Sequence, residues 1–100
     1  MEITIVKNDA GNEMTVKLKG KLDTQTAPEA QTKIDEQLGG VSKLILDLRE
    51  LSYISSAGIR VLLLLSRAMS SKGELILRSV QPSVMDVLEL VGINDDLNIE

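Results

Sequence analysis

Residues 46–63, with the sequence LDLRELSYISSAGIRVLL, form the most informative stretch of this chain. It begins inside a nearly continuous apolar run, residues 44–48, which is typical of a central strand covered on both faces. A short polar loop follows, and the hydroxyl side chains of Ser55 and Ser56 then precede a Leu-rich segment. That segment is too long for a strand, so we predict a helix from about Ala57 to Ser71.

The two serines stand where this predicted helix begins. Serine is a favoured N-cap, because its side-chain oxygen accepts a backbone N–H group of the first turn. The unpaired N–H groups and the positive end of the helix dipole also favour an anion there. A phosphate on Ser55 or Ser56 would add about −1.5 to −2 charge at pH 7. On the residues alone, a helix cap is the simpler interpretation and a phosphorylation site is the alternative.

Alternating hydrophobic residues predict two strands near the N-terminus. Ile3 and Ile5 alternate with polar residues, and so do the hydrophobic residues of segment 14–18. The intervening segment 8–12, Asn-Asp-Ala-Gly-Asn, is rich in turn-forming residues. We therefore expect the two strands to form a β-hairpin.

A capping-box pattern marks the start of the next predicted helix. Thr26 is followed three residues later by Glu29, and Pro28 lies between them, where a first turn tolerates it. The pair Gly39-Gly40 ends the helical pattern.

The C-terminal third predicts one more strand and one more helix. Segment 74–78 contains the apolar run Leu-Ile-Leu and is expected to be a strand, and residues 82–91 are expected to be a helix that stops at Gly92. A last short strand is expected at residues 97–99. Helices that alternate with strands after an opening hairpin indicate an α/β fold: a mixed sheet of four to five strands with three or more packed helices. Its 100 residues suit a single domain, residues 1–100.

The composition lacks residues that several classes of function require. The chain has no Cys and no His, so the commonest metal ligands and the commonest general base are missing. An enzyme would need Ser56 with a helper such as Lys21, and no Gly-rich phosphate loop is present. We therefore expect a non-enzymatic protein without a metal or cofactor. The net charge of −4 and the lack of Trp and Phe argue against nucleic-acid binding.

The hydropathy pattern gives an expectation about location. The N-terminus lacks a basic stretch followed by an apolar run, so it is not a signal peptide. The longest apolar run, residues 61–65, is too short to span a bilayer. A cytoplasmic protein with no direct membrane insertion is predicted.

The central stretch, together with motifs along nearly the whole chain, resembles the STAS domain family, named for sulfate transporters and anti-sigma factor antagonists. That family's signature is a strand ending in apolar-Asp-apolar, a short loop with an aromatic residue, and Asp-Ser-Ser/Thr-Gly-Leu opening a Leu-rich helix. The corresponding segments here are residues 55–59 (SSAGI), 20–23 (GKLD), 73–75 (GEL), 82–84 (PSV) and 91–93 (VGI). Their order and spacing favour the anti-sigma factor antagonist type and imply a STAS-type fold.

The resemblance implies a specific role for Ser56. In the family, a kinase that is also the anti-sigma factor phosphorylates the serine two residues before the motif glycine, which here is Gly58. The unphosphorylated protein binds that anti-sigma factor and frees the sigma factor, and a metal-dependent serine phosphatase restores this form. Asp23 matches the family's acidic residue in the loop near the phosphoacceptor. The expected oligomeric state is a monomer or weak dimer.

This chain departs from the family signature at two positions. Ser55 stands where the motif has its leading Asp, and Ala57 stands where it has a second hydroxyl residue. The first change removes a carboxylate and leaves Ser55 as a competing phosphorylation site.

Helical spacing groups the residues expected to meet a partner. Positions three and four residues apart share a face of a helix, so the residues after Ser56 form a stripe that mixes apolar side chains with arginine. A wide core flanked by solvated arginines would explain the same pattern, and Asp23 could be only a loop or capping residue. The predicted partner-binding residues are Asp23, Ser55, Ser56, Ile59, Arg60, Leu63 and Arg67, whereas Leu62, Leu65 and Met69 are predicted to lie in the core.

The same fold is also compatible with a second function. STAS modules also serve as accessory or scaffold subunits of membrane transporters or signalling complexes, and they then bind a partner without being phosphorylated.

Overall fold

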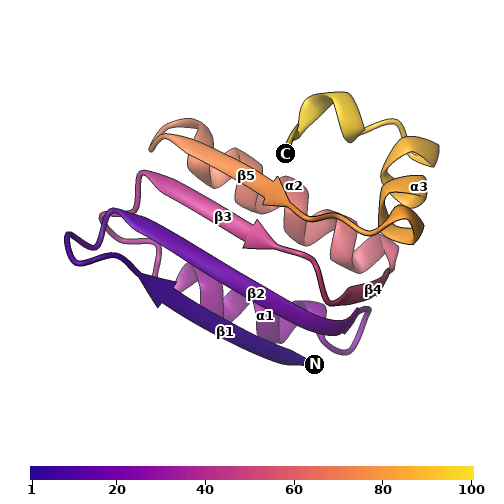
Figure 1. Cartoon of the computed structure of the whole chain (residues 1–100), viewed down its shortest axis with the longest axis horizontal. Coiled ribbons are helices and arrows are strands. Elements are labelled where there is room, and N and C mark those ends of the chain that lie inside the picture. Colours follow the sequence, from indigo (N-terminus) through magenta and orange to yellow (C-terminus); the bar gives the residue numbers. More distant parts are fainter.

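The computed structural model describes residues 1–100, which form a mixed sheet with helices packed on it (Figure 1). In chain order the elements are β1 (Glu2–Lys7), β2 (Glu13–Leu22), α1 (Ala27–Asp35), β3 (Lys43–Asp47), β4 (Leu51–Ile54), α2 (Ser56–Ser70), β5 (Glu74–Arg78), α3 (Pro82–Leu90), the 3-10 helix η1 (Asn94–Asp96) and β6 (Asn98–Ile99).

The predicted fold class is confirmed. The strands run in the order β1-β2-β3-β5-β6, and β4 pairs separately with β2. β1 and β2 form the predicted antiparallel hairpin, whereas all other pairs are parallel. The sheet has six strands, one more than the upper number predicted, because β4 is a strand.

β4 occupies most of the segment that we interpreted as a polar loop. Leu51 and Ile54 are buried, but Ser52 and Tyr53 between them are exposed, so the segment shows no regular alternation. Its pairing with the end of β2 includes a register shift between Gly20 and Lys21. A strand held by such distant pairing leaves little trace in its own sequence.

Helices α1 and α2 lie behind the sheet in Figure 1, and the main core lies between them and the strands. The core side of β2 is formed by Met14, Val16, Leu18 and Leu22, all at most 1% exposed. From α2, the predicted core residues Leu62, Leu65 and Met69 are buried against them, which confirms that part of the helical pattern.

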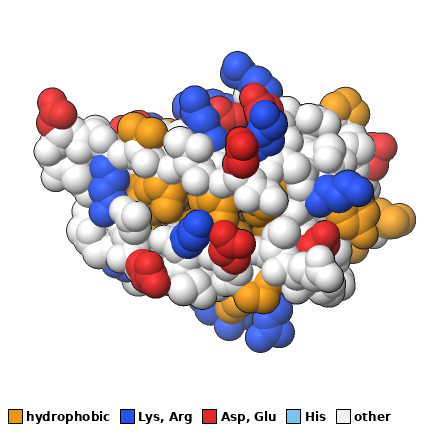
Figure 2. Space-filling model, turned by 90° about the horizontal axis from the view of Figure 1, so that it is seen from below, with side chains coloured by type: hydrophobic (Ala, Val, Ile, Leu, Met, Phe, Trp, Pro, Cys, Tyr) orange, Lys and Arg blue, Asp and Glu red, His pale blue; other side chains and the backbone are white.

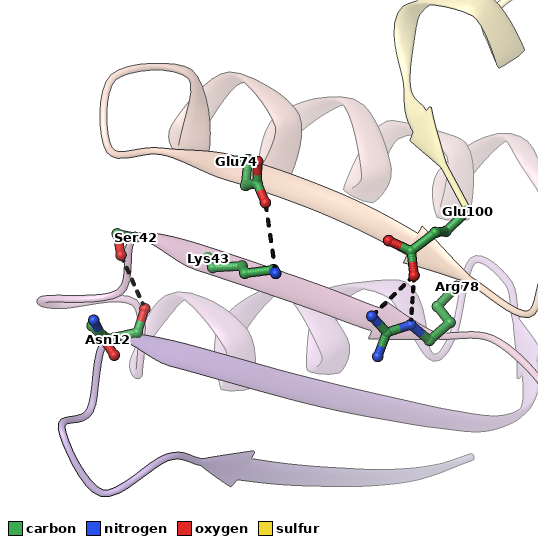
Figure 3. A network of polar contacts seen from close by, with 6 residues as sticks. All are labelled: Asn12, Ser42, Lys43, Glu74, Arg78 and Glu100. Atoms are coloured by element: carbon green, nitrogen blue, oxygen red, sulfur yellow. Dashed lines mark hydrogen bonds and ion pairs between the residues drawn. The ribbon is translucent and has the colours of Figure 1, made fainter.

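The opposite sheet face, which these two helices leave uncovered, has its own small apolar centre. Ile45 of β3 and Ile76 of β5 are register partners and are only 2% and 4% exposed. Lys43–Glu74 and Arg78–Glu100 ion pairs, at 3.9 and 3.0 Å, flank them along the strands (Figure 3). The aliphatic stems of such side chains can shield apolar neighbours while their charged ends stay in water.

β1 is an edge strand, and the core is less completely covered beside it. Ile3 and Ile5 are only half-buried, although they pack against the core. From below, on the side where β1 and α1 lie in Figure 1, hydrophobic side chains are visible in a hollow between charged ones (Figure 2). Charged residues beside an exposed strand edge disfavour unwanted strand pairing.

The start of α1 differs from the capping box that the sequence predicts. The Thr26 side chain makes no capping bond to the helix. Instead, Asp23 and Thr26 bind each other: the Asp23 backbone N–H donates to Thr26 Oγ1 at 2.9 Å, and the Thr26 N–H donates to Asp23 Oδ1 at 3.0 Å. The helix also ends at Asp35, before the glycine pair.

The other predicted elements lie close to their expected positions. The short C-terminal strand is present as β6, parallel to β5. The helix predicted at about Ala57 to Ser71 is α2, one residue earlier at each end. None of the helices combines the length and apolar character that crossing a membrane requires.

Candidate functional site

The turn after β2 and the turn after β4 lie side by side. Leu22 and Ile54, the last residues of these two strands, are register partners, and the Ser55 backbone N–H donates to the Leu22 carbonyl at 2.9 Å. In Figure 1 the turns that lead into α1, α2 and α3 all lie at the right end of the molecule. Ligands of open α/β sheets bind at this carboxyl end of the strands. The fold therefore brings Asp23 next to the start of α2.

The two serines have different environments. Ser55 is the N-cap of α2: its backbone is extended, and its Oγ accepts from the Gly58 N–H at 3.5 Å. Ser56 is the first helical residue, and its side chain is exposed and makes no hydrogen bond within the chain. Ser55 is thus half-buried, and its hydroxyl oxygen accepts a hydrogen bond from the helix. The hydroxyl of Ser56 is exposed and has no partner within the chain.

Replacing the two serines separately should distinguish the cap from the free hydroxyl. Ser55→Ala is expected to lower the free energy of unfolding by about 0.5–1 kcal/mol, because the N-cap acceptor is lost. Ser56→Ala removes an exposed group without a partner and should change stability by less than about 0.5 kcal/mol. Urea denaturation of both variants measures this difference. Equal effects, or a larger effect for Ser56→Ala, would contradict the assignment of the cap to Ser55.

Asp23 is held rigidly in the turn between β2 and α1. Its Oδ1 accepts from the backbone N–H groups of Thr26 and Gln25, both at 3.0 Å. These bonds, first that to Thr26, lower the pKa of Asp23, and nearby Lys21 adds a smaller effect. Asp23 is therefore a fixed negative charge beside the α2 N-terminus, and it also stabilises the turn.

The lowered pKa of Asp23 predicts a pH dependence of stability. A carboxylate whose pKa is lower in the folded state stabilises the fold above its unfolded pKa of about 3.9, and this contribution is lost as pH falls through the folded value. The stability difference between the native chain and Asp23→Asn should therefore be largest near neutral pH and shrink in acid. Denaturation of both proteins across this range is the measurement. A difference that grows in acid would exclude the mechanism.

The exposed face of α2 matches most of the predicted stripe. Ser56, Arg60, Leu63 and Arg67 are exposed, and the Leu63 side chain, at 41%, is among the most exposed large apolar groups. Ile59 differs from these, because it is half-buried and packs against the core. The stripe therefore offers one apolar and two cationic side chains beside the Ser56 hydroxyl.

A shallow groove of about 200 Å³ runs between α1 and α2 next to this stripe. Sequence reasoning missed it, because the groove is made by two helices that are distant in the sequence. One sequence feature could have indicated this groove. Pro28 and Gln31 are three residues apart on α1, next to its buried alanines, and therefore lie on one face of the helix. The groove is lined by Thr24, Ala27, Pro28, Gln31, Ala57, Arg60, Val61 and Leu64.

A larger hollow of about 300 Å³ lies elsewhere, on the outer face of β1, β2 and the loop after β3. Its lining mixes both signs of charge, including Lys19 and Glu50, which form an ion pair at 3.7 Å. None of the predicted site residues lines it. The groove beside Ser56 is smaller but is the one connected to the candidate site.

Comparison with known proteins identifies related sequences and structures. The family profile described as the STAS domain matches residues 3–100. BtrV of Bordetella bronchiseptica, a protein named as an anti-sigma factor antagonist, is 36% identical over 77 residues. That alignment covers 75% of this chain and 66% of BtrV, just under two thirds of the relative's length.

Solved structures share the fold at low sequence identity. The anti-sigma factor antagonist SpoIIAA in its unphosphorylated form has a TM-score of 0.77 at 20% identity, over 99% of this chain and 87% of that chain. Its phosphorylated form, from Bacillus, has a TM-score of 0.74 at 20% identity, over 99% and 91%. A sulfate transporter family protein from Wolinella succinogenes has a TM-score of 0.77 at 18% identity, over 93% and 75%.

Proposed function

The chain belongs to the STAS domain family, and we propose that it is an anti-sigma factor antagonist controlled by phosphorylation of Ser56. The unphosphorylated protein binds an anti-sigma factor that is also a serine kinase. The similarity to BtrV supports the antagonist function. The single observation that carries the choice of residue is the exposed, unbonded hydroxyl of Ser56 at the start of α2.

The proposed cycle uses the chain as a substrate and a binding partner, not as an enzyme. The kinase transfers the γ-phosphoryl group of ATP to Ser56 Oγ, which loses its proton, and ADP leaves. A metal-dependent serine phosphatase hydrolyses the phosphoester and restores the hydroxyl. The protein acts in the cytoplasm as a monomer or weak dimer. Support for a reversible change of this kind comes from SpoIIAA, which exists in an unphosphorylated and a phosphorylated form.

The binding surface in this proposal surrounds Ser56. It comprises the fixed charge of Asp23, the N-cap Ser55, and the α2 stripe with Arg60, Leu63 and Arg67. Ile59 supports the stripe from its half-buried position. Arginine and exposed apolar side chains are a composition suited to protein interfaces.

A pull-down with three forms of the chain tests the proposal. The native chain and Ser56→Ala should both retain a serine kinase of the anti-sigma type, identified by mass spectrometry, and Ser56→Asp should release it. Incubation of the purified kinase and ATP with the native chain should add one phosphate by intact mass, and Ser56→Ala should accept none. Retention of the kinase by all three forms would refute a switch at Ser56.

The shared fold of the Wolinella succinogenes transporter protein favours one second candidate. In this alternative the chain is an accessory or scaffold subunit of a membrane transporter or signalling complex and is not phosphorylated. Capture of a transporter subunit, together with no phosphate uptake from any kinase encoded beside the gene, would favour this function.

A further inference from the structure

Arg60 has a free cationic side chain close to the proposed phosphorylation site. It lies four residues after Ser56 on the same exposed face of α2, and it makes no ion pair or side-chain hydrogen bond. The four ion pairs of the chain all use other residues. Residues four apart on a helix have Cβ atoms about 5–6 Å from each other, so a guanidinium at position 60 can reach a group carried by position 56.

Few neighbouring groups compete for this guanidinium. The first turn of α2 contains no acidic residue, and β4 contains no charged one. On α1, Glu29 already pairs with Lys33 at 3.1 Å. In the turn before α1, Asp23 has its Oδ1 bound to backbone N–H groups and lies near the opposite charge of Lys21.

We propose that Arg60 binds the phosphate once Ser56 is phosphorylated, closing an ion pair across one turn of α2. The inference rests on the proposed modification of Ser56. Guanidinium donors match phosphate oxygens in pairs and form short, charge-assisted hydrogen bonds. The N-terminus of α2 favours the same anion, because its backbone N–H groups and dipole are positive.

This ion pair gives phosphorylation a second effect on the surface. Without phosphate, Arg60 is free and borders the groove between α1 and α2. With phosphate, its guanidinium is drawn toward residue 56 and is no longer available to a carboxylate of the partner. One modification therefore removes both a hydroxyl and a cation from the binding surface, and it requires no change in the fold.

The test measures the phosphate directly and needs no kinase. Phosphoserine is incorporated genetically at position 56 of the full chain, and its ³¹P NMR signal is followed against pH. A cation ~5 Å away should lower the second pKa of the phosphate by about 0.6 at the dielectric constant of water. The second pKa should therefore be lower in the chain with Arg60 than in the Arg60→Gln variant by about this amount.

Arg67→Gln is the matched control, because it removes the same charge from the same face of the same helix. Position 67 lies about 16 Å along the helix from position 56, beyond the Debye length of about 8 Å at physiological ionic strength. Its removal should leave the second pKa of the phosphate unchanged. Identical titrations of the Arg60 chain and Arg60→Gln would overturn the proposal, and so would an equal effect of Arg67→Gln.

The titration and the binding assay can fail independently. A second pKa that does not depend on Arg60, combined with loss of the kinase on phosphorylation, would reject this ion pair and leave the proposed function intact. An Arg60-dependent second pKa, combined with no phosphorylation by the partner, would support the ion pair and reject the proposed function.

Discussion

Under the proposed function, phosphorylation of Ser56 is expected to weaken binding of the proposed anti-sigma kinase roughly 100- to 1,000-fold. The phosphate adds about two negative charges at the proposed binding surface, and a partner that covers this surface removes water from those charges. Asp23 in the adjacent turn adds repulsion against the phosphate when a partner covers both groups, because its carboxylate is charged at neutral pH. Isothermal titration calorimetry of both forms against the purified kinase measures the ratio of dissociation constants.

Ser56→Asp should reproduce part of this effect. It places one negative charge at position 56 instead of about two, so we expect a loss of roughly 10- to 100-fold. Ser70→Asp is the control, since it adds the same charge to the same helix about 21 Å away along its axis. It should leave binding unchanged. Unaltered affinity of both Ser56→Asp and the phosphorylated chain would show that this surface is not the interface.

The fold itself should not change in these variants. An acidic group in the first turn of a helix stabilises it by about 0.3–1 kcal/mol, and the first turn of α2 has no acidic residue of its own. Backbone amide shifts in Ser56→Asp should therefore be confined to residues near 55–60. Widespread shifts would indicate a conformational switch in place of a local change of charge.

Elements with strong local patterns could be predicted from the sequence. The apolar run that became β3 and the Leu-rich helix α2 were expected within one or two residues. Two local features were misread, one because a distant strand decides it and the other because a residue three positions away competes for the capping side chain. β4 depends on pairing with β2, and Thr26 binds back to Asp23 instead of capping α1 in the expected way.

The candidate site, too, could be predicted only in part from the sequence. Helical spacing correctly placed Arg60, Leu63 and Arg67 on the exposed face with Ser56. The sequence left Ser55 and Ser56 as competing acceptors, and only backbone geometry assigns the cap to Ser55. The groove beside Arg60 depends on how α1 packs against α2, which no short segment of sequence specifies.

Gly58→Ala is expected to lower the free energy of unfolding by about 2 kcal/mol, although alanine is the better helix former. The higher helix propensity of alanine contributes about 1 kcal/mol of stabilisation in a helix interior. A Cβ atom at Gly58 would lie 2.7 Å from both Ile54 Cγ1 and the Leu22 carbonyl oxygen, and 2.9 Å from Leu22 Cγ. Overpacking typically costs about 1–3 kcal/mol. Three contacts below 3.0 Å place this site at the upper end, about 3 kcal/mol, so the net loss after the propensity gain is about 2 kcal/mol.

The contact with the Leu22 carbonyl makes this clash hard to relieve. That oxygen accepts from the Ser55 N–H at 2.9 Å, so α2 can retreat from β2 only by disturbing the bond that places Ser55 and Ser56. Gly39→Ala is the control, because a Cβ there meets nothing within 4 Å, and it should alter stability by less than about 0.5 kcal/mol. Thermal unfolding should show a fall of about 10 °C for Gly58→Ala alone. If Gly58→Ala proved as stable as the native chain, the close packing of α2 on the end of β2, and with it the fixed position of Ser56, would be wrong.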